Sequence, residues 1–368
     1  MAPTDIGNWP RRARRAVEKQ LGIRIDIERR LNSWINPAFD PTEGRYFPQP
    51  ELTSCGCGGL HQITRSDWAG IDRTLVFTYS LEKSDHPGVQ LRALQVADLL
   101  IASSPPIELR VQALQNLYRS RQRNLLVIAG NTAVQPKWEF MIRALKSRGN
   151  RVLVDLVDRG LPAELKGVPD GFVCSSLTEE RERRSQGLRT VRFLHGPNLR
   201  FPRQDFNKRS FELSYFGDPK NAPHLHDLSR LDVLSSDDMW PPRHRDPLPD
   251  DDRLFHFYQS SHHYLVRRWN PYDAFKPPTK AAVAARLGAV AVASREDDEL
   301  RLILGDDYPY LSSTSSLNDV RDTVEYARAS HLGPDWERAV KTMRRVRQLT
   351  CPVATAKTLL AGLRDFSA

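Results

Sequence analysis

Short, almost wholly apolar runs alternate with amphipathic segments through much of this 368-residue chain. In the first half these runs are TLVFTY at 74–79, LLVIAG at 125–130, RVLVDLVD at 151–158, GFVCSS at 171–176 and TVRFLH at 190–195. A strand that is apolar throughout is buried on both faces, and a helix between two such strands provides the crossover that parallel pairing needs. The pattern therefore predicts a parallel, doubly wound α/β sheet.

The same alternation resumes after a polar, proline-containing stretch at 195–210 that has the composition of a linker. A chain of this length is expected to form two domains. We predict an α/β protein in which two Rossmann-like domains face a cleft, preceded by a helical extension. The expected boundaries are 1–72 for the basic helical extension and irregular segment, 73–200 for the first domain, 210–350 for the second and 351–368 for a last helix.

Three shorter segments also receive definite predictions. Pro105 and Pro106 are typical of a helix start, so a helix is expected at 105–121. A short helix is expected at 224–228. The aromatic run RLFHFYQ at 253–259 is expected to be a strand of the second domain.

The net charge of +9 and the pI near 9.5 favour anionic partners. Part of the excess is a basic cluster at 11–19, inside a segment whose apolar residues recur at helical spacing. Two interpretations stay open: a packing helix with a solvated basic face, or a helix lying on an anionic membrane surface. Because no aromatic-interleaved basic surface or nucleic-acid motif accompanies the cluster, no nucleic-acid partner is expected.

Composition also bears on the compartment and on metal chemistry. No run approaches the roughly 18 apolar residues of a membrane span, and the N-terminus lacks the apolar core of a secretory signal. We therefore expect a cytoplasmic protein, with peripheral contact at the inner membrane face if the basic helix binds lipid. Cys55, Cys57 and His61 could form half of a metal site, but no second Cys/His cluster completes it, so neither metal nor cofactor is expected.

The most informative stretch for chemistry is NPYDAFKPPTKAAVAARLGAVAVAS at 270–294. Lys276, Thr279 and Lys280 precede or open an Ala-rich helix that ends at Gly288, before an apolar strand. The helix dipole disfavours cations at an N-terminus unless an anion binds there. This turn therefore predicts a phosphate-binding site, the alternative being that the lysines are merely solvated.

Three acidic residues follow that strand: Asp297, Asp298 and Glu299. In doubly wound sheets, ligands bind beyond the carboxyl ends of the strands. These carboxylates could therefore accept hydrogen bonds from the hydroxyl groups of a ribose or sugar, or Glu299 could favour the start of the next helix.

The same rule selects residues after other expected strands. Gly217 follows the run FELSYF, and His262 and Arg267 follow the expected strand at 253–259. His262 is a candidate for proton transfer or phosphate contact, and Arg267 for contact with an anion. In the first domain, His86 and Asp85 in the turn SDHPG are candidate general bases for a hydroxyl acceptor. The alternative is that this turn has no catalytic role.

The segment FKPPTKAAVAARLGAVAVAS resembles the donor-side segment of GT-B glycosyltransferases of the group 1, or glycosyltransferase 4, type. GFVCSSLTEERERRSQGLRTVRFLHGPNL resembles the strand, helix and His/Asn-Gly loop that precede the interdomain linker of that family. The resemblance implies that Lys276 and Lys280 neutralise a diphosphate leaving group without a metal, and that the acceptor contacts the turn at 80–88. One departure is clear, because Val283 stands where many retaining members have a glutamate.

We therefore expect a glycosyltransferase of the hexosyltransferase class. It would move a sugar from a nucleotide-diphosphate-sugar donor to a hydroxyl acceptor on a small molecule, glycan or lipid carrier. Two alternatives stay open: a nucleotide-sugar epimerase of the same fold, and a catalytically silent nucleotide- or glycan-binding protein.

Overall fold

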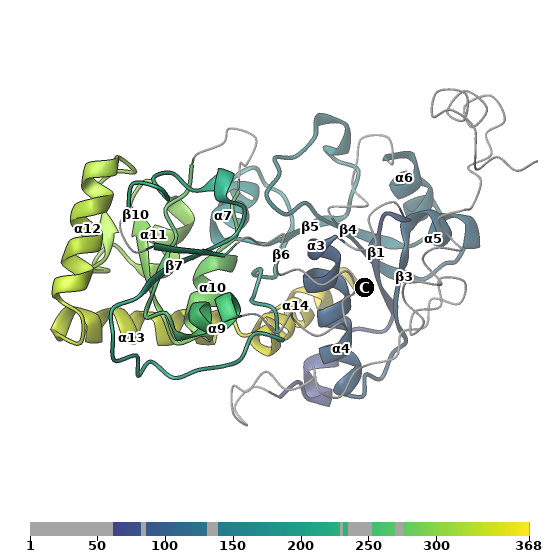
Figure 1. Ribbon diagram of the computed structural model, residues 1–368. Coiled ribbons are helices and arrows are strands. Elements are labelled where there is room, and N and C mark those ends of the chain that lie inside the picture. Colours follow the sequence, from purple (N-terminus) through teal and green to yellow (C-terminus); the bar gives the residue numbers. More distant parts are fainter. Residues whose placement is uncertain are drawn as a thin grey trace, which may run out of the picture.

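The computed structural model describes residues 62–81, 86–130, 139–228, 231–234, 252–268 and 275–367. The expected helices of the basic extension, Cys55, Cys57 and Asp85 lie outside these ranges. Within them, the chain forms two parallel sheets side by side, each with helices packed against it (Figure 1). The prediction of two doubly wound α/β domains is confirmed.

The N-terminal sheet has six strands in the order β2-β1-β3-β4-β5-β6, all parallel. Its central strands are buried along most of their length, which explains their continuous apolar sequence. The strands are β1 (Thr74–Tyr79), β2 (Leu109–Ala113), β3 (Leu125–Ala129), β4 (Arg151–Asp155), β5 (Gly171–Cys174) and β6 (Thr190–Arg192). The helices are α3 (Pro87–Val89), η6 (Gln90–Leu94), α4 (Gln95–Ala102), α5 (Leu114–Ser120), α6 (Glu139–Ser147), η8 (Ala163–Leu165) and α7 (Leu177–Ser185).

The C-terminal sheet has five parallel strands in the order β11-β10-β9-β7-β8. The strands are β7 (Leu213–Phe216), β8 (Leu231–Leu234), β9 (His262–Tyr264), β10 (Val290–Ser294) and β11 (Leu311–Ser312). The helices are η9 (Pro219–Asn221), α9 (Asp252–Gln259), α10 (Thr279–Arg286), α11 (Asp298–Leu304), α12 (Leu317–Ala329) and α13 (Pro334–Leu349). Parallel order in both sheets brings the carboxyl ends of the strands to one edge of each domain, where ligands bind in such folds.

The predictions for three segments were wrong. The expected helix at 105–121 is an edge strand, β2, followed by the shorter helix α5, because Val111 and Ala113 are buried beside β1. The expected strand at 253–259 is helix α9, in which Leu254 and Phe257 are buried three residues apart while Phe255 is 60% exposed.

The third wrong prediction is the short helix at 224–228, which is a series of turns. His224 has a backbone φ of 63°, in the left-handed region. A right-handed helix cannot run through a residue in that conformation.

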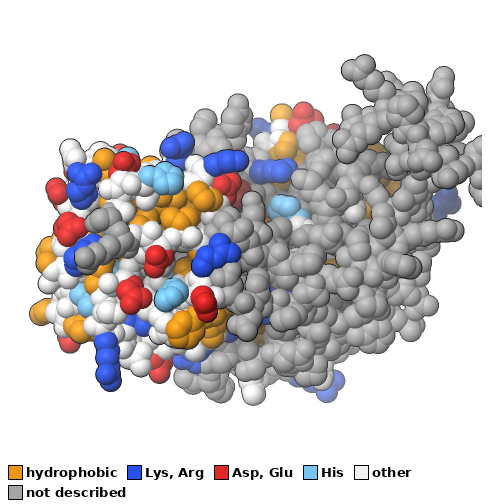
Figure 2. All heavy atoms as spheres, viewed as in Figure 1, with side chains coloured by type: hydrophobic (Ala, Val, Ile, Leu, Met, Phe, Trp, Pro, Cys, Tyr) orange, Lys and Arg blue, Asp and Glu red, His pale blue; other side chains and the backbone are white. Residues whose placement is uncertain are grey.

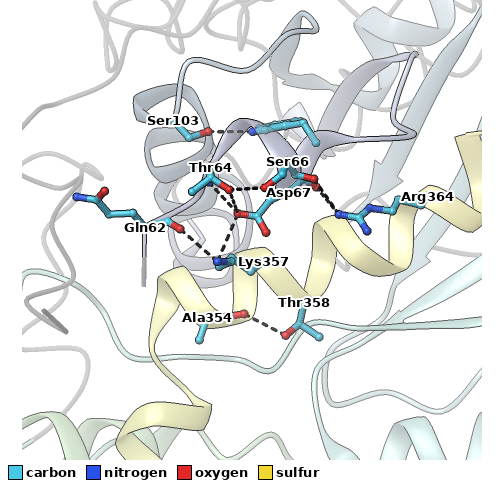
Figure 3. Close-up of polar contacts among 10 residues, drawn as sticks. Gln62, Thr64, Ser66, Asp67, Ser103, Ala354, Lys357, Thr358 and Arg364 are labelled. Atoms are coloured by element: carbon cyan, nitrogen blue, oxygen red, sulfur yellow. Dashed lines mark hydrogen bonds and ion pairs between the residues drawn. The ribbon is translucent and has the colours of Figure 1, made fainter. Parts of the chain in front are cut away.

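The last helix, α14 (Pro352–Ser367), crosses from the C-terminal domain and packs on the N-terminal one, against β6, α4 and the short helix η4 (Arg65–Trp68). Leu359, Leu360 and Leu363 of α14 are buried in the same core as β1. Figure 3 shows the polar contacts that accompany this packing: Lys357 pairs with Asp67 at 3.4 Å, and Arg364 donates to backbone carbonyls of η4. The described part of the expected last helix, 351–367, is therefore part of the N-terminal core. No helix in the described ranges has the length and apolar character needed to cross a membrane.

Trp68 should be a principal contributor to this core. Its side chain is 1% exposed, and its Nε1 donates to Ser103 Oγ at 3.0 Å. We expect Trp68→Ala to cost about 3–5 kcal/mol, because it removes a large buried ring and leaves a cavity. Phe140→Ala, at a side chain that is 51% exposed, should change stability little. Thermal melts followed by circular dichroism check both, and equal melting temperatures for the two variants would contradict the assignment.

Candidate functional site

A cavity of about 910 Å³ lies where the two domains meet, within the size range of small-molecule sites. The N-terminal domain contributes the first turns of α7, and the C-terminal domain contributes residues that follow β9 and β10. Five residues predicted from the sequence line it: Arg267, Lys276, Asp297, Asp298 and Glu299. On the face shown in Figure 2, basic and acidic side chains are interspersed over the C-terminal domain.

Lys276 reaches this wall from the turn before α10. Its Nζ lies 3.7 Å from Asp158 Oδ2 of the N-terminal domain. The preceding residue, Phe275, forms an antiparallel β-bridge with the same Asp158. The cation is therefore held at the junction of the two domains.

Lys280 lies in the first turn of α10, where its Nζ donates to Tyr215 Oη at 2.7 Å. Burial, together with the nearby positive charges of Arg267 and Lys276, lowers the pKa of Lys280 to about 7. Lys280 is thus only partly charged at neutral pH, and a bound polyanion would favour its charged form.

Gly217, after β7, packs directly against Lys280. Its φ is +140°, and a Cβ at this position would lie 3.0 Å from Lys280 Nζ. Only glycine suits this conformation and this close approach. The structure thus brings together two residues that the sequence placed on the donor side, and it adds Tyr215, which sequence reasoning missed.

Thr279 is the first residue of α10. No side chain caps the start of this helix. Thr279 Oγ1 is buried and has no hydrogen-bond partner among the described residues. Such a hydroxyl at an uncapped helix start is available to an anionic ligand.

Arg267 and Asp297 form an ion pair on the cavity wall. The other oxygen of Asp297 caps α11 by accepting from the Leu300 backbone N–H at 3.0 Å. Asp298 is exposed and pairs with Arg301 at 2.7 Å. The acidic turn is thus largely engaged in local contacts, in contrast to the expectation of carboxylates directed at a ribose.

Glu299 differs most from its expected role. Its carboxylate accepts from the Leu177 N–H at 3.0 Å, and from the Thr178 N–H and hydroxyl at 2.8 and 2.9 Å. These donors are the first residues of α7 in the other domain, so Glu299 caps a helix across the domain boundary. Burial raises the pKa of Glu299. Both oxygens thus form an interdomain contact, and the expected contact with a sugar hydroxyl stays a prediction.

His262 also lies elsewhere than expected. It belongs to β9 instead of following a strand, since the preceding segment is helical. Its ring is fully buried against Phe211, Tyr310 and Trp336, and its Nδ1 is 2.8 Å from Ser261 Oγ. Burial lowers the pKa of His262 well below its ordinary value. The side chain is a neutral member of the core and does not line the cavity.

His86 is exposed at the start of the first helix, where its Nδ1 accepts from the Gly88 N–H at 3.0 Å. Its carbonyl accepts from the Val89 N–H. These hydrogen bonds stabilise the start of the helix. They agree with the alternative that His86 belongs to a turn with a structural role. They leave its role as a general base untested.

Val283, at the position where the resemblance expects a glutamate, points into the core of the C-terminal domain. It is buried in a cluster with Phe201 and Leu287. Helix α10 therefore presents no carboxylate to the cleft from this position.

The chain has the GT-B fold. Its two parallel-sheet domains have a cleft between them, and the last helix returns to pack on the first domain. A glycosyltransferase from Rickettsia africae ESF-5 superposes with a TM-score of 0.56 at 8% identity, over 80% of this chain and 98% of its own. The α,α-trehalose 6-phosphate synthase of Burkholderia multivorans gives 0.50 at 10% identity, over 80% and 99%. HepE of Anabaena in complex with UDP-glucose gives 0.50 at 11% identity, over 79% and 98%.

No protein-family model matches the sequence, and a comparison with curated proteins finds no relative. At identities near one in ten, the structural likeness establishes the fold. The activity is a separate question that depends on the site.

Proposed function

We propose that this protein is a metal-independent glycosyltransferase that moves a sugar from a nucleotide-diphosphate-sugar donor to a hydroxyl acceptor. The observation that carries the proposal is the arrangement at the start of α10. Lys280 and the unpartnered Thr279 hydroxyl lie in the first turn of α10, and Lys276, just before that helix, lines a cavity large enough for a nucleotide. The neighbours solved with this fold include one bound to UDP-glucose, which supports a nucleotide sugar as the donor.

The chemistry follows from where charge develops. When the bond between the sugar and the diphosphate breaks, the leaving diphosphate gains negative charge, and cations already in place stabilise it without reorganisation. Lys276 and Lys280 supply such charge, as does Arg267 if its pairing with Asp297 loosens. In this proposal no metal is needed to neutralise the leaving group, and the hexosyl group faces the N-terminal domain.

The pH dependence of donor binding tests the role of Lys280. Because its pKa is lowered to about 7 in the free protein, much of its charge is lost by pH 8. A bound diphosphate favours the charged form, so binding at pH 8 should take up a proton, and affinity should fall as pH rises from 7 to 9. Calorimetric titration in two buffers of different ionisation enthalpy measures the uptake. Binding enthalpies that are equal in both buffers would count against the assignment.

A catalytically silent nucleotide- or glycan-binding protein is the second candidate, and one observation favours it. Val283 places a buried apolar side chain where the family resemblance expects a glutamate that contacts the donor. Binding without turnover is the expected behaviour of such a protein.

One experiment separates these candidates. Calorimetry with a panel of nucleoside diphosphates first shows whether the cleft binds any of them, and failure with all would remove the proposal. Incubation with UDP-glucose and a mixture of sugar and glycolipid acceptors then distinguishes the outcomes. Transfer or slow hydrolysis supports a transferase. Interconversion of the sugar supports an epimerase, and the absence of both reactions supports a binding protein.

Contact with a membrane and residence in the cytoplasm remain proposals of the same kind. The membrane contact rests on the basic cluster at 11–19, which lies outside the described residues, and cytoplasmic residence rests on the sequence composition alone. Co-sedimentation with vesicles containing anionic lipid, compared with neutral vesicles, tests the contact.

A further inference from the structure

A buried ion pair lies at the carboxyl edge of the N-terminal sheet, outside the lining of the large cavity. Arg92 Nε, on η6, lies 2.5 Å from Asp155 Oδ2, the last residue of β4, and both side chains are at least 95% buried. Arg92 Nη1 donates to the Phe193 carbonyl at 2.8 Å, and the guanidinium lies over the Phe193 ring. The pair is thus held rigidly in one orientation.

Each partner keeps one polar atom without a hydrogen bond. Arg92 Nη2 and Asp155 Oδ1 are buried and make no hydrogen bond of normal geometry with the described residues, although the Val157 backbone N–H lies close enough to the Asp155 carboxylate to favour its charged form. Buried charged groups left in this way are rare because the lost hydrogen bond is costly. The two atoms can therefore take up hydrogen bonds from water or from a ligand.

A small hollow opens at the pair. Its volume is about 20 Å³, enough for one small polar group. Thr78 and Gly130 line it together with the apolar side chains of Phe77, Val89 and Ile128. The hollow thus combines one charged donor and one charged acceptor with apolar walls.

The backbone around the hollow is distorted in two places. Arg92 lies in a π-helical turn, Gln90–Leu94, and such turns occur frequently at functional sites. Val157, which also lines the hollow, has a φ of 33°, which is rare for a β-branched residue. Strained conformations of this kind cluster at binding sites. The strained segment continues to Asp158, which pairs with Lys276 on the wall of the large cavity.

The chemistry of the pair selects the ligand. A carboxylate beside the guanidinium repels an anion, and the guanidinium repels a cation. A hydroxyl group suits both, since it donates to Asp155 Oδ1 and accepts from Arg92 Nη2. The apolar walls suit the C–H groups that accompany a sugar hydroxyl.

We propose that the Arg92–Asp155 pair is a subsite for a hydroxyl group of a neutral sugar. This inference rests on the proposed function, because the sugar is a substrate of the same interdomain cleft. The sugar belongs either to the nucleotide donor or to a separate acceptor, and both offer the same hydroxyl chemistry.

The test replaces the whole pair by apolar side chains, Arg92→Met with Asp155→Leu. Apolar residues of similar volume often replace a buried ion pair at no cost in stability, so this variant is expected to fold. Asp155→Asn, which keeps the shape of the side chain, is the second variant. The control, Glu108→Gln with Arg110→Gln, removes a partly exposed ion pair of 2.5 Å in the same domain.

Calorimetry with UDP and UDP-glucose, and saturation-transfer NMR with free hexoses and disaccharides, give the readouts. We expect both pair variants to bind UDP as the wild type does. If the donor sugar occupies the subsite, they lose about tenfold in affinity for UDP-glucose, the worth of one charge-assisted hydrogen bond. If a separate acceptor occupies it, binding of a free saccharide weakens by a similar factor and UDP-glucose binding is unchanged.

Two results would overturn the inference. In one, UDP-glucose and saccharide binding are the same in wild type, control and pair variants, which means that the pair holds only water. In the other, the wild type binds no sugar of the panel beyond what UDP alone contributes. Saccharide binding that depends on the pair, in a protein that binds no nucleoside diphosphate, would instead remove the proposed function and leave the subsite standing.

Discussion

Lys280→Met is expected to raise the dissociation constant for UDP by about 10- to 100-fold. The variant keeps the length and apolar stem of the side chain, so the packing against Gly217 and Tyr215 is retained while the charge is lost. The effect is large because Lys280 is largely enclosed, and a charge shielded from water interacts more strongly with a phosphate than a solvated one. Calorimetric titration at pH 7 and low salt measures it.

Lys220→Met is the matched control. Lys220 lies in the same domain but is exposed to solvent and far less enclosed than Lys280. The Lys220→Met substitution removes the same formal charge as Lys280→Met. Any loss of UDP affinity common to both variants therefore reflects the overall electrostatic field of the domain. Equal losses would show that α10 does not hold the phosphate.

Glu299→Ala should produce the second large effect, on the contact between the domains. The substitution leaves the Leu177 and Thr178 N–H groups of α7 without their carboxylate acceptor. Hydrogen bonds to a charged group contribute about 1.5–3 kcal/mol each, so we expect a loss of several kcal/mol from the interface. Hydrogen exchange measured by mass spectrometry should show faster exchange in the peptide that contains the start of α7.

Asp298→Ala provides the comparison for this result. Asp298 is the neighbouring residue on the same helix, but it is exposed and pairs only with its own helix. Protection of α7 should be unchanged in this variant. If Glu299→Ala also leaves α7 protected, the closed contact between α7 and α11 does not persist in solution.

The interior strands could be predicted from the sequence because burial on both faces leaves a continuous apolar run. β3 and β4 illustrate this, with almost every side chain inaccessible to solvent. The edge strand β2 could not, since LRVQA is partly polar and pairs on one side only. α9 was missed for a related reason, because an aromatic segment of seven residues is compatible with either period and only the fold decides between them.

In the candidate site too, residues whose role depends on nearby sequence could be predicted, and residues whose partners lie far away in the sequence could not. Lys276, Thr279 and Lys280 could be selected because the conflict between their charge and the helix dipole is contained within a few residues. The role of Glu299 could not, since its hydrogen-bond donors lie more than a hundred residues away in the other domain. The Arg92–Asp155 pair joins residues that are 63 positions apart, so no local sequence pattern predicts it.

The return of α14 to the N-terminal domain makes the C-terminal domain an insertion in the chain, held by two covalent connections instead of one. One runs through 195–210 and the other through the junction of α13 and α14 at 349–352. A domain joined by two connections can rotate about the line between them. It cannot turn freely about other axes or move away from the first domain. We therefore expect opening and closing of the cleft to be the principal relative motion of the domains, and their separation by a protease to require a cut in both connections.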